Sequence, residues 1–154
     1  MTRNNGSTKS ITSLADLLPD PRNARRHNPR NIGVIEDALH EVGAARSIVI
    51  DEDGLILAGN GVVEAAGNAG IERVRVVEAD GEEIVAVMRR GLTPAQKTRL
   101  ALYDNRTAEL ADWAPDVLAA MLLDDKALLE GLFQGKELTD ILKDLAVEPV
   151  EDPG

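Results

Sequence analysis

One short stretch near the middle of the chain constrains the fold most, because strand signals give way there to helix signals. Residues 47–50 are rich in β-branched side chains, the pair Asp53-Gly54 is a turn signal, and residues 55–58 are apolar. This pattern predicts a hairpin or tight strand pair. Glycines then break the pattern, and the Ala- and Val-rich residues that follow predict a short helix. A strand pair that leads directly into a helix favours the α+β class.

Helix signals lie on both sides of this stretch. Asn28 followed by Pro29 is typical of a helix start, and apolar residues then recur at three-to-four spacing as far as Gly43, a stop signal. Thr93 and Gln96 have the spacing of a capping box, which predicts a helix that runs to about residue 110. Two later apolar runs, the first opened by a proline, predict further helices in the last third of the chain.

Three other segments are expected to contribute strands. Residues 10–12, 74–77 and 84–88 are rich in β-branched side chains, and Asp80-Gly81 is a turn signal between the last two. The predicted architecture is therefore a small mixed β-sheet flanked by helices, followed by a C-terminal helical extension.

Composition excludes several kinds of site. The chain has no cysteine, which removes disulfides, thiolate metal sites and cysteine nucleophiles together. No apolar run approaches the roughly 18–20 residues that a membrane span needs, and the polar amino terminus has no apolar stretch of the kind found in signal peptides. We therefore expect a cytoplasmic protein with no membrane partner.

The net charge of −10 is unevenly distributed. Residues 1–30 carry six Lys and Arg against two acids, whereas residues 107–154 carry three Lys against twelve acids. A basic amino-terminal patch can still meet phosphate, because salt limits the reach of the distant acids to about 8–10 Å. The alternative is an acidic protein whose arginines pair with its own carboxylates.

The first candidate site is the glycine turn, which consists of Gly59, Asn60 and Gly61. It follows a predicted strand and opens a predicted helix, so its backbone N–H groups are suited to bind a phosphate or a carboxylate. The alternative is a tight turn in which small residues such as Ala65 and Ala66 permit close packing.

The second candidate site is the tetrad Tyr103, Asp104, Asn105 and Arg106. Asp104 and Asn105 supply hard oxygen ligands of the kind that Mg²⁺ accepts beside a phosphate, and Arg106 can bind an anion with two hydrogen bonds. Successive polar residues on a helix point in different directions, so at least one is expected to face the interior or a cleft. The alternative is that Asp104 braces the arginine cluster, defined next, through an ion pair.

The third candidate site is the arginine cluster, which consists of Arg22, Arg25, Arg26 and Arg30. Guanidinium groups on an extended loop are suited to bind the phosphates of a nucleotide or of a DNA backbone. The alternative is a structural loop that acidic side chains hold in place.

These motifs belong to longer segments with a recognisable order. The chain contains, in sequence, PRNARRH, IVIDEDGLILAGNGVVEAA, VRVVEADGEEIVAV and ALYDNRTAELADW. Together they resemble the amino-terminal ParB domain, which has the sulfiredoxin-like fold. The resemblance covers about residues 11–122, and the last segment is similar to the form of this domain that is fused to DNA methyltransferases. We accordingly expect a disordered lead at 1–8, a ParB/sulfiredoxin-like domain at 9–111, a helical extension at 112–146 and a linker-like tail at 147–154.

The resemblance implies a nucleotide-handling pocket. ParB proteins bind and hydrolyse CTP while they clamp on DNA, and other relatives are nucleases, an ATP-using sulfinic-acid reductase or a free-serine kinase. By position, Arg25 and Arg26 would contact phosphates, the glycine turn would cradle them, and Asp104 with Asn105 would hold Mg²⁺ and act in catalysis. Arg22 and Arg106 would be further phosphate-binding groups. The DNA-binding set would be Arg25, Arg26 and Arg30.

Two positions depart from the family pattern. Asn60 stands where relatives carry a charged or catalytic residue, and Val62 stands where they usually carry a phosphate-binding arginine. Loss of one charged hydrogen bond to phosphate costs roughly 1.5–3 kcal/mol. The absence of cysteine excludes sulfiredoxin chemistry.

The resemblance favours a ParB-like module in DNA modification, mobile-element or plasmid-maintenance transactions, with DNA, CTP or ATP, and Mg²⁺ as ligands. It leaves open whether the chain is a Mg²⁺-dependent NTPase, a nuclease or no enzyme at all. The alternative is a non-catalytic adaptor that docks a DNA methyltransferase or another protein through the helical extension. A homodimer is a further expectation.

Overall fold

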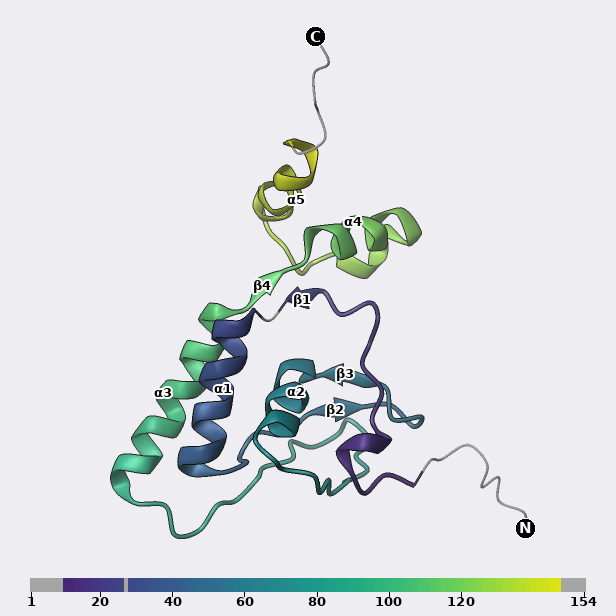
Figure 1. The fold of residues 1–154 in the computed structure, drawn as a ribbon. Helices are drawn as coiled ribbons and strands as arrows, with labels where there is room; N and C mark the ends of the chain where they lie inside the picture. Colours follow the sequence, from purple (N-terminus) through teal and green to yellow (C-terminus); the bar gives the residue numbers. More distant parts are fainter. Residues whose placement is uncertain (1–9, 27, 148–154) are drawn as a thin grey trace, which may run out of the picture. The chain divides into compact units, whose positions relative to one another are not determined.

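The computed structural model describes residues 10–26 and 28–147. The predicted lead at 1–8 and residues 148–154 of the predicted tail lie outside the described residues. The chain divides into two compact units, the first within Met1–Pro21 and His27–Ala111, the second within Arg22–Arg26 and Asp112–Gly154. Each contains helices and short antiparallel strand pairs, so the predicted α+β class is confirmed (Figure 1).

In the first unit, helix α1, Pro29–Val42, starts after Asn28 and ends before Gly43, as the sequence predicts. The Oδ1 atom of Asn28 accepts a hydrogen bond from the backbone N–H of Asn31 at 2.7 Å, which caps the first turn. Gly43 follows the last turn with φ 79°, a conformation that glycine adopts without steric cost. The Arg89 guanidinium donates to the Val42 carbonyl at 2.6 Å, so a cation lies at the negative end of the helix.

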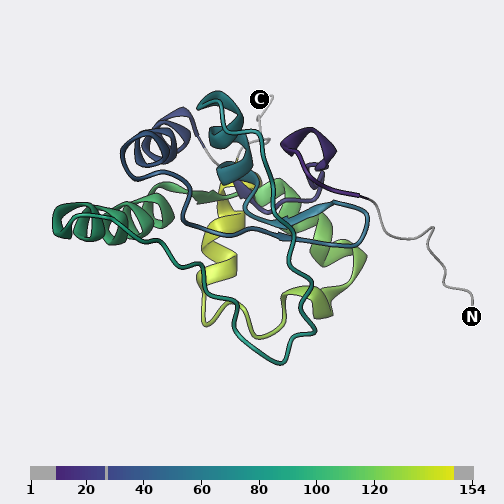
Figure 2. The same cartoon turned by 90° about the horizontal axis from the view of Figure 1, so that it is seen from below.

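Helix α3, Pro94–Leu110, begins with the predicted capping box. The backbone N–H of Gln96 donates to Thr93 Oγ1 at 3.1 Å, and the N–H of Thr93 donates to Gln96 Oε1 at 2.9 Å. The helix packs beside α1 and runs antiparallel to it in Figure 1, and Figure 2 shows the two helices side by side from below. The buried Asn31 amide donates to the Thr107 carbonyl at 2.8 Å at one end of this contact.

A hairpin leads into the third helix of this unit. Strands β2, Val49–Ile50, and β3, Ile56–Ala58, pair antiparallel as predicted, and helix α2, Asn60–Asn68, follows at once. Helix α2 packs on α1, where the buried side chains form a small aliphatic core of Ile32, Ile35 and Ala65, with Leu39 beside them.

The sheet is smaller than the sequence predicts. Residues 74–77 and 84–88 form no strand, and residues 10–12 add only the neighbouring isolated bridge between Ser13 and Arg73. The β-prone side chains of these runs are largely exposed, with Ile84 at 93%. Strand propensity acts through packing against a paired strand. The described residues supply such pairing only at one end of these runs, where the Val74 N–H donates to the Thr12 carbonyl at 2.9 Å.

Mixed strand pairing is nevertheless present. A single turn of 3₁₀-helix, η2 at Leu14–Asp16, precedes Leu18, which forms an isolated parallel bridge with Leu55. Leu55 lies immediately before β3, the second strand of the antiparallel hairpin. Parallel and antiparallel contacts therefore meet at one place in the first unit.

The second unit is built from a short segment near the amino terminus and from the residues that follow Ala111. Strand β1, Arg25–Arg26, pairs antiparallel with β4, Asp112–Trp113, and α4, Pro115–Asp124, follows. A 3₁₀-turn, η3 at Lys126–Leu129, and helix α5, Glu137–Val147, complete this unit. Among the described residues of the whole chain, no helix has the length and apolar character that crossing a membrane requires.

Candidate functional site

Three of the four arginines of the arginine cluster lie in the second unit. Arg25 is opposite Trp113 in the β1–β4 pair, and its guanidinium carbon lies 4.7 Å from the centre of the indole ring. The same indole meets Phe133 edge-on at 5.2 Å. These contacts make Arg25 part of a cation–π and aromatic stack, which holds the strand pair to the segment that follows α4.

The other two arginines of this unit pair with acids of α4. Arg26 lies 2.7 Å from Asp116 and Arg22 lies 3.5 Å from Asp124, with all four side chains more than half exposed. Exposed ion pairs of this kind contribute little stability, about 0–1 kcal/mol. A phosphate that binds here must displace the carboxylates. Arg30, the fourth member of the cluster, is exposed on α1 in the first unit.

The glycine turn lies at the start of α2, where the sequence predicts it. Gly59 is the N-cap residue, with φ 105°, and no side chain caps the helix. The Oδ1 atom of Asn60 accepts a hydrogen bond from the backbone N–H of Asp20 at 3.4 Å, so this side chain contacts the preceding loop. Gly61 is buried.

The tetrad lies on α3, and its members face different directions. Asp104 forms an ion pair with Arg46, with 3.2 Å between Oδ1 and Nε. The sequence analysis left open a brace between Asp104 and the arginine cluster, whereas the ion-pair partner of Asp104 is Arg46. Arg106 pairs with Glu109 one turn later at 2.9 Å, and Asn105 is exposed.

Tyr103 belongs to a polar cluster between α1 and α3. Its hydroxyl donates to Glu41 at 2.9 Å and accepts from the guanidinium of Arg99 at 3.1 Å, while Arg99 also pairs with Glu41. The hydrogen bond from Arg99 is the main reason that the pKa of Glu41 lies below its ordinary value. Burial, and then the hydrogen bond to Glu41, raises the pKa of Tyr103.

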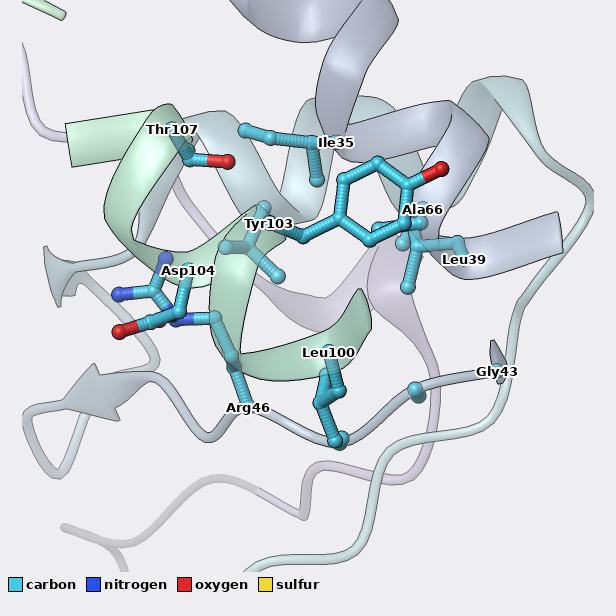
Figure 3. A pocket seen from close by; sticks show the side chains of 13 residues that line it. Ile35, Leu39, Gly43, Arg46, Ala66, Leu100, Tyr103, Asp104 and Thr107 are labelled. Atoms are coloured by element: carbon cyan, nitrogen blue, oxygen red, sulfur yellow. Dashed lines mark ion pairs between the residues drawn. The ribbon is translucent and has the colours of Figure 1, made fainter. Parts of the chain in front are cut away.

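A pocket opens between the three helices of the first unit (Figure 3). Its enclosed part has a volume of about 70 Å³, and the pocket opens to solvent. The walls are largely apolar, and they include Ile35 and Leu39 from α1, Val62 and Ala66 from α2, and Leu100 and Tyr103 from α3. Arg46 and Asp104 lie together at one side of it (Figure 3).

The pocket brings together part of the tetrad and a residue next to the glycine turn, whereas Gly59, Asn60 and Gly61 do not line it. Val62, in the first turn of α2 after the glycine turn, and Tyr103 with Asp104 from the tetrad line the same space. Asn105 and Arg106 are not among the residues that line it. Asp104 is the one carboxylate in this lining, and the described residues contain no group of three or more His, Cys, Asp or Glu that could hold a metal ion.

Arg46 is the pocket residue that sequence reasoning missed. It lies in the short connection between the end of α1 and β2, outside every motif. The available signal was weak: a single charge between small residues, immediately after a helix stop at Gly43. Only the packing of α1 against α3 brings this side chain next to Asp104.

Comparison with known proteins supplies the family. No family model matches the chain, and no solved structure matches it significantly. YnaK of Escherichia coli, a ParB-like nuclease domain-containing protein, is 31% identical to the chain over 86 residues. The matched region covers 56% of this chain and 87% of the relative. At this identity and coverage, the chain belongs to the family of ParB-like nuclease domain proteins.

Proposed function

We propose that this chain is a ParB-like module that binds a nucleoside triphosphate, CTP or ATP, at the pocket of its first unit during a DNA transaction. One observation carries the proposal: the first turn of α2 and the Asp104 side chain line the same cavity. Val62, the residue after the glycine turn, and Asp104, the expected Mg²⁺ ligand, thus border one space, although they are about forty residues apart in the chain.

The start of α2 supports the phosphate part of this proposal. No side chain caps the helix, and Gly59 lets the backbone lie close to Ile48, the residue before β2. The N–H groups of a first turn carry partial positive charge and favour an anion. The mainly apolar walls of the pocket suit the base better than the phosphates, which we assign to the side that carries Arg46.

Mg²⁺ fits this site only together with phosphate. Asp104 is a single carboxylate, and proteins commonly bind Mg²⁺ through one or two carboxylates plus the phosphate oxygens of the substrate. When bound, the ion would stabilise negative charge on a phosphoryl oxygen. Asp104 would orient it, and the apolar walls would limit the access of water. Hydrolysis of a triphosphate, or of a phosphodiester as the name of the relative suggests, is the proposed extension of this binding role.

Calorimetric titration with CTP, ATP and GTP, with and without Mg²⁺, tests the proposal. We expect binding of at least one triphosphate that Mg²⁺ strengthens, and we expect Asp104→Asn to remove the effect of Mg²⁺ because the carboxylate ligand is lost. Asp37→Asn is the matched control, since it removes an exposed aspartate of α1 that does not line the pocket. Absence of heat for all three nucleotides at millimolar concentration would refute the proposal.

A specific feature favours a second candidate function, that of an adaptor. Leu123, Leu128 and Leu132 are exposed in and after α4, with Leu123 at 90%. Exposed leucines close together in sequence are suited to protein contact. We therefore propose docking of a DNA methyltransferase or another protein through this segment as the alternative. The double variant Leu123→Ser, Leu132→Ser should lose partner binding, and retained binding would contradict the adaptor function. Leu57→Ser, which changes an exposed leucine of β3, is the control and should bind the partner normally.

A further inference from the structure

The side chains of the pocket differ sharply in polarity. Most of the lining is aliphatic or small, whereas Arg46 and Asp104 form an ion pair at one side (Figure 3). Of the arginines in the described residues, Arg46 is the one that lines this pocket. Position 62, in the first turn of α2, holds a valine, so the helix itself contributes no cation there.

We propose that Arg46 is the anion-binding residue of this pocket and that the ligand is a nucleoside phosphate, with its base against the aliphatic wall and a phosphate on the guanidinium. This inference rests on the function proposed above, and it assigns the phosphate contact to a residue outside the three motifs. The ligand class follows from the polarity of the lining, since one cation beside an apolar surface suits a molecule with an anionic group and a flat apolar part.

The Arg46–Asp104 ion pair is suited to an exchange in which a phosphate replaces the carboxylate of Asp104 as the partner of Arg46. The two side chains are 50% and 55% exposed, and the Nε–Oδ1 distance is 3.2 Å. An exposed pair contributes little to folding, so the guanidinium can reorient towards a ligand at low cost. A guanidinium binds phosphate through two parallel hydrogen bonds, a geometry that lysine cannot reproduce. Asp104 would then hold Arg46 near the pocket until a phosphate replaces the carboxylate.

The test compares two arginine substitutions that change the net charge equally. Arg46→Gln removes the pocket guanidinium, and Arg75→Gln removes an exposed guanidinium of the same unit that does not line the pocket. CTP and ATP are titrated into both variants and into the wild-type chain in the same magnesium-containing buffer. We expect Arg46→Gln to weaken binding about tenfold or more, Arg75→Gln to have little effect, and Arg46→Lys to be intermediate. Thermal unfolding of each variant verifies that the fold is retained.

The outcomes separate this inference from the proposed function. If the wild-type chain binds the nucleotide and both Arg46→Gln and Arg75→Gln bind it as tightly as wild type, the role of Arg46 is overturned and nucleotide binding stands. Equal losses in the two variants would indicate long-range charge alone and would also overturn it. A wild-type chain that binds neither CTP nor ATP would overturn both.

Discussion

At the start of α2, the backbone of Gly59 has φ 105°, and a Cβ atom built on it would lie 2.5 Å from Cγ2 of Ile48. Both conditions exclude a side chain, because L-residues avoid this region of φ and a heavy-atom contact of that length is repulsive. The identity of this residue is therefore explained by the fold alone, whatever ligand the turn binds. The structural interpretation of the glycine turn and the phosphate-binding one are compatible.

We predict that Gly59→Ala lowers the free energy of unfolding by about 2–4 kcal/mol, from the cost of positive φ together with overpacking. Gly67→Ala is the matched control. Gly67 lies within α2, and a Cβ atom there would meet nothing within 4 Å. That substitution should be neutral or stabilising by up to about 1 kcal/mol. Urea unfolding of the two variants checks the difference, and equal stabilities would contradict it.

At the scale of elements, α1 and α3 are joined by polar contacts as well as by packing. The Asn31 amide contacts α3 at one end, and the cluster of Glu41, Arg99 and Tyr103 connects the helices at the other. The pocket lies along this contact and shares Tyr103 with the cluster. The alignment of the two helices therefore determines both the pocket wall and the position of Asp104, one residue further along α3.

The Glu41 cluster predicts a pH dependence of stability. The pKa of Glu41 is lower in the folded state than its ordinary value of 4.5, mainly because Arg99 donates to the carboxylate. A lowered folded-state pKa stabilises the protein above about pH 4.5, and this stabilisation is lost as the pH falls through the folded-state value. We expect Glu41→Gln to be less stable than wild type at pH 7 and the difference to shrink below pH 4.5.

Urea unfolding between pH 3 and pH 7 measures this difference. Glu64→Gln, which replaces an exposed glutamate of α2, serves as the control and should differ little from wild type at pH 7. A deficit of Glu41→Gln that stays constant across this range would show that the carboxylate charge is not responsible.

At the scale of the whole molecule, the structure pairs the basic segment of the chain with the acidic one. Residues 1–30 are basic and residues 107–154 are acidic, and the second unit combines a basic strand from the first segment with acidic helices from the second. Arg22 and Arg26 are consequently occupied by Asp124 and Asp116. If DNA binds through this unit, its phosphates compete with these two carboxylates.

We therefore predict that Asp116→Asn strengthens binding to duplex DNA about two- to fivefold, which is the factor that corresponds to one exposed ion pair. Asp37→Asn changes the net charge equally but lies on α1, so it should have a smaller effect. Fluorescence anisotropy with a labelled duplex at several salt concentrations measures both. Equal gains in the two variants would indicate a general effect of net charge.

The agreement between sequence and structure is best where the signals are local. The Asn28 cap, the Thr93–Gln96 capping box and the hairpin before the glycine turn are correct because each depends on contacts within a few residues. The predicted strands at 74–77 and 84–88 are wrong because a strand requires a partner that local composition cannot supply. Arg46 was missed for the same reason, since its contact with Asp104 spans two elements.

The sequence by itself determined the α+β class, the boundaries of α1 and α3 and the motifs that resemble the ParB family, because these depend on short-range periodicity, capping and residue order. Only the tertiary structure decided which acids face the arginine cluster and which charged residue borders the pocket. Those pairings join segments far apart in the chain, and their geometry follows from how helices pack, which no local pattern encodes.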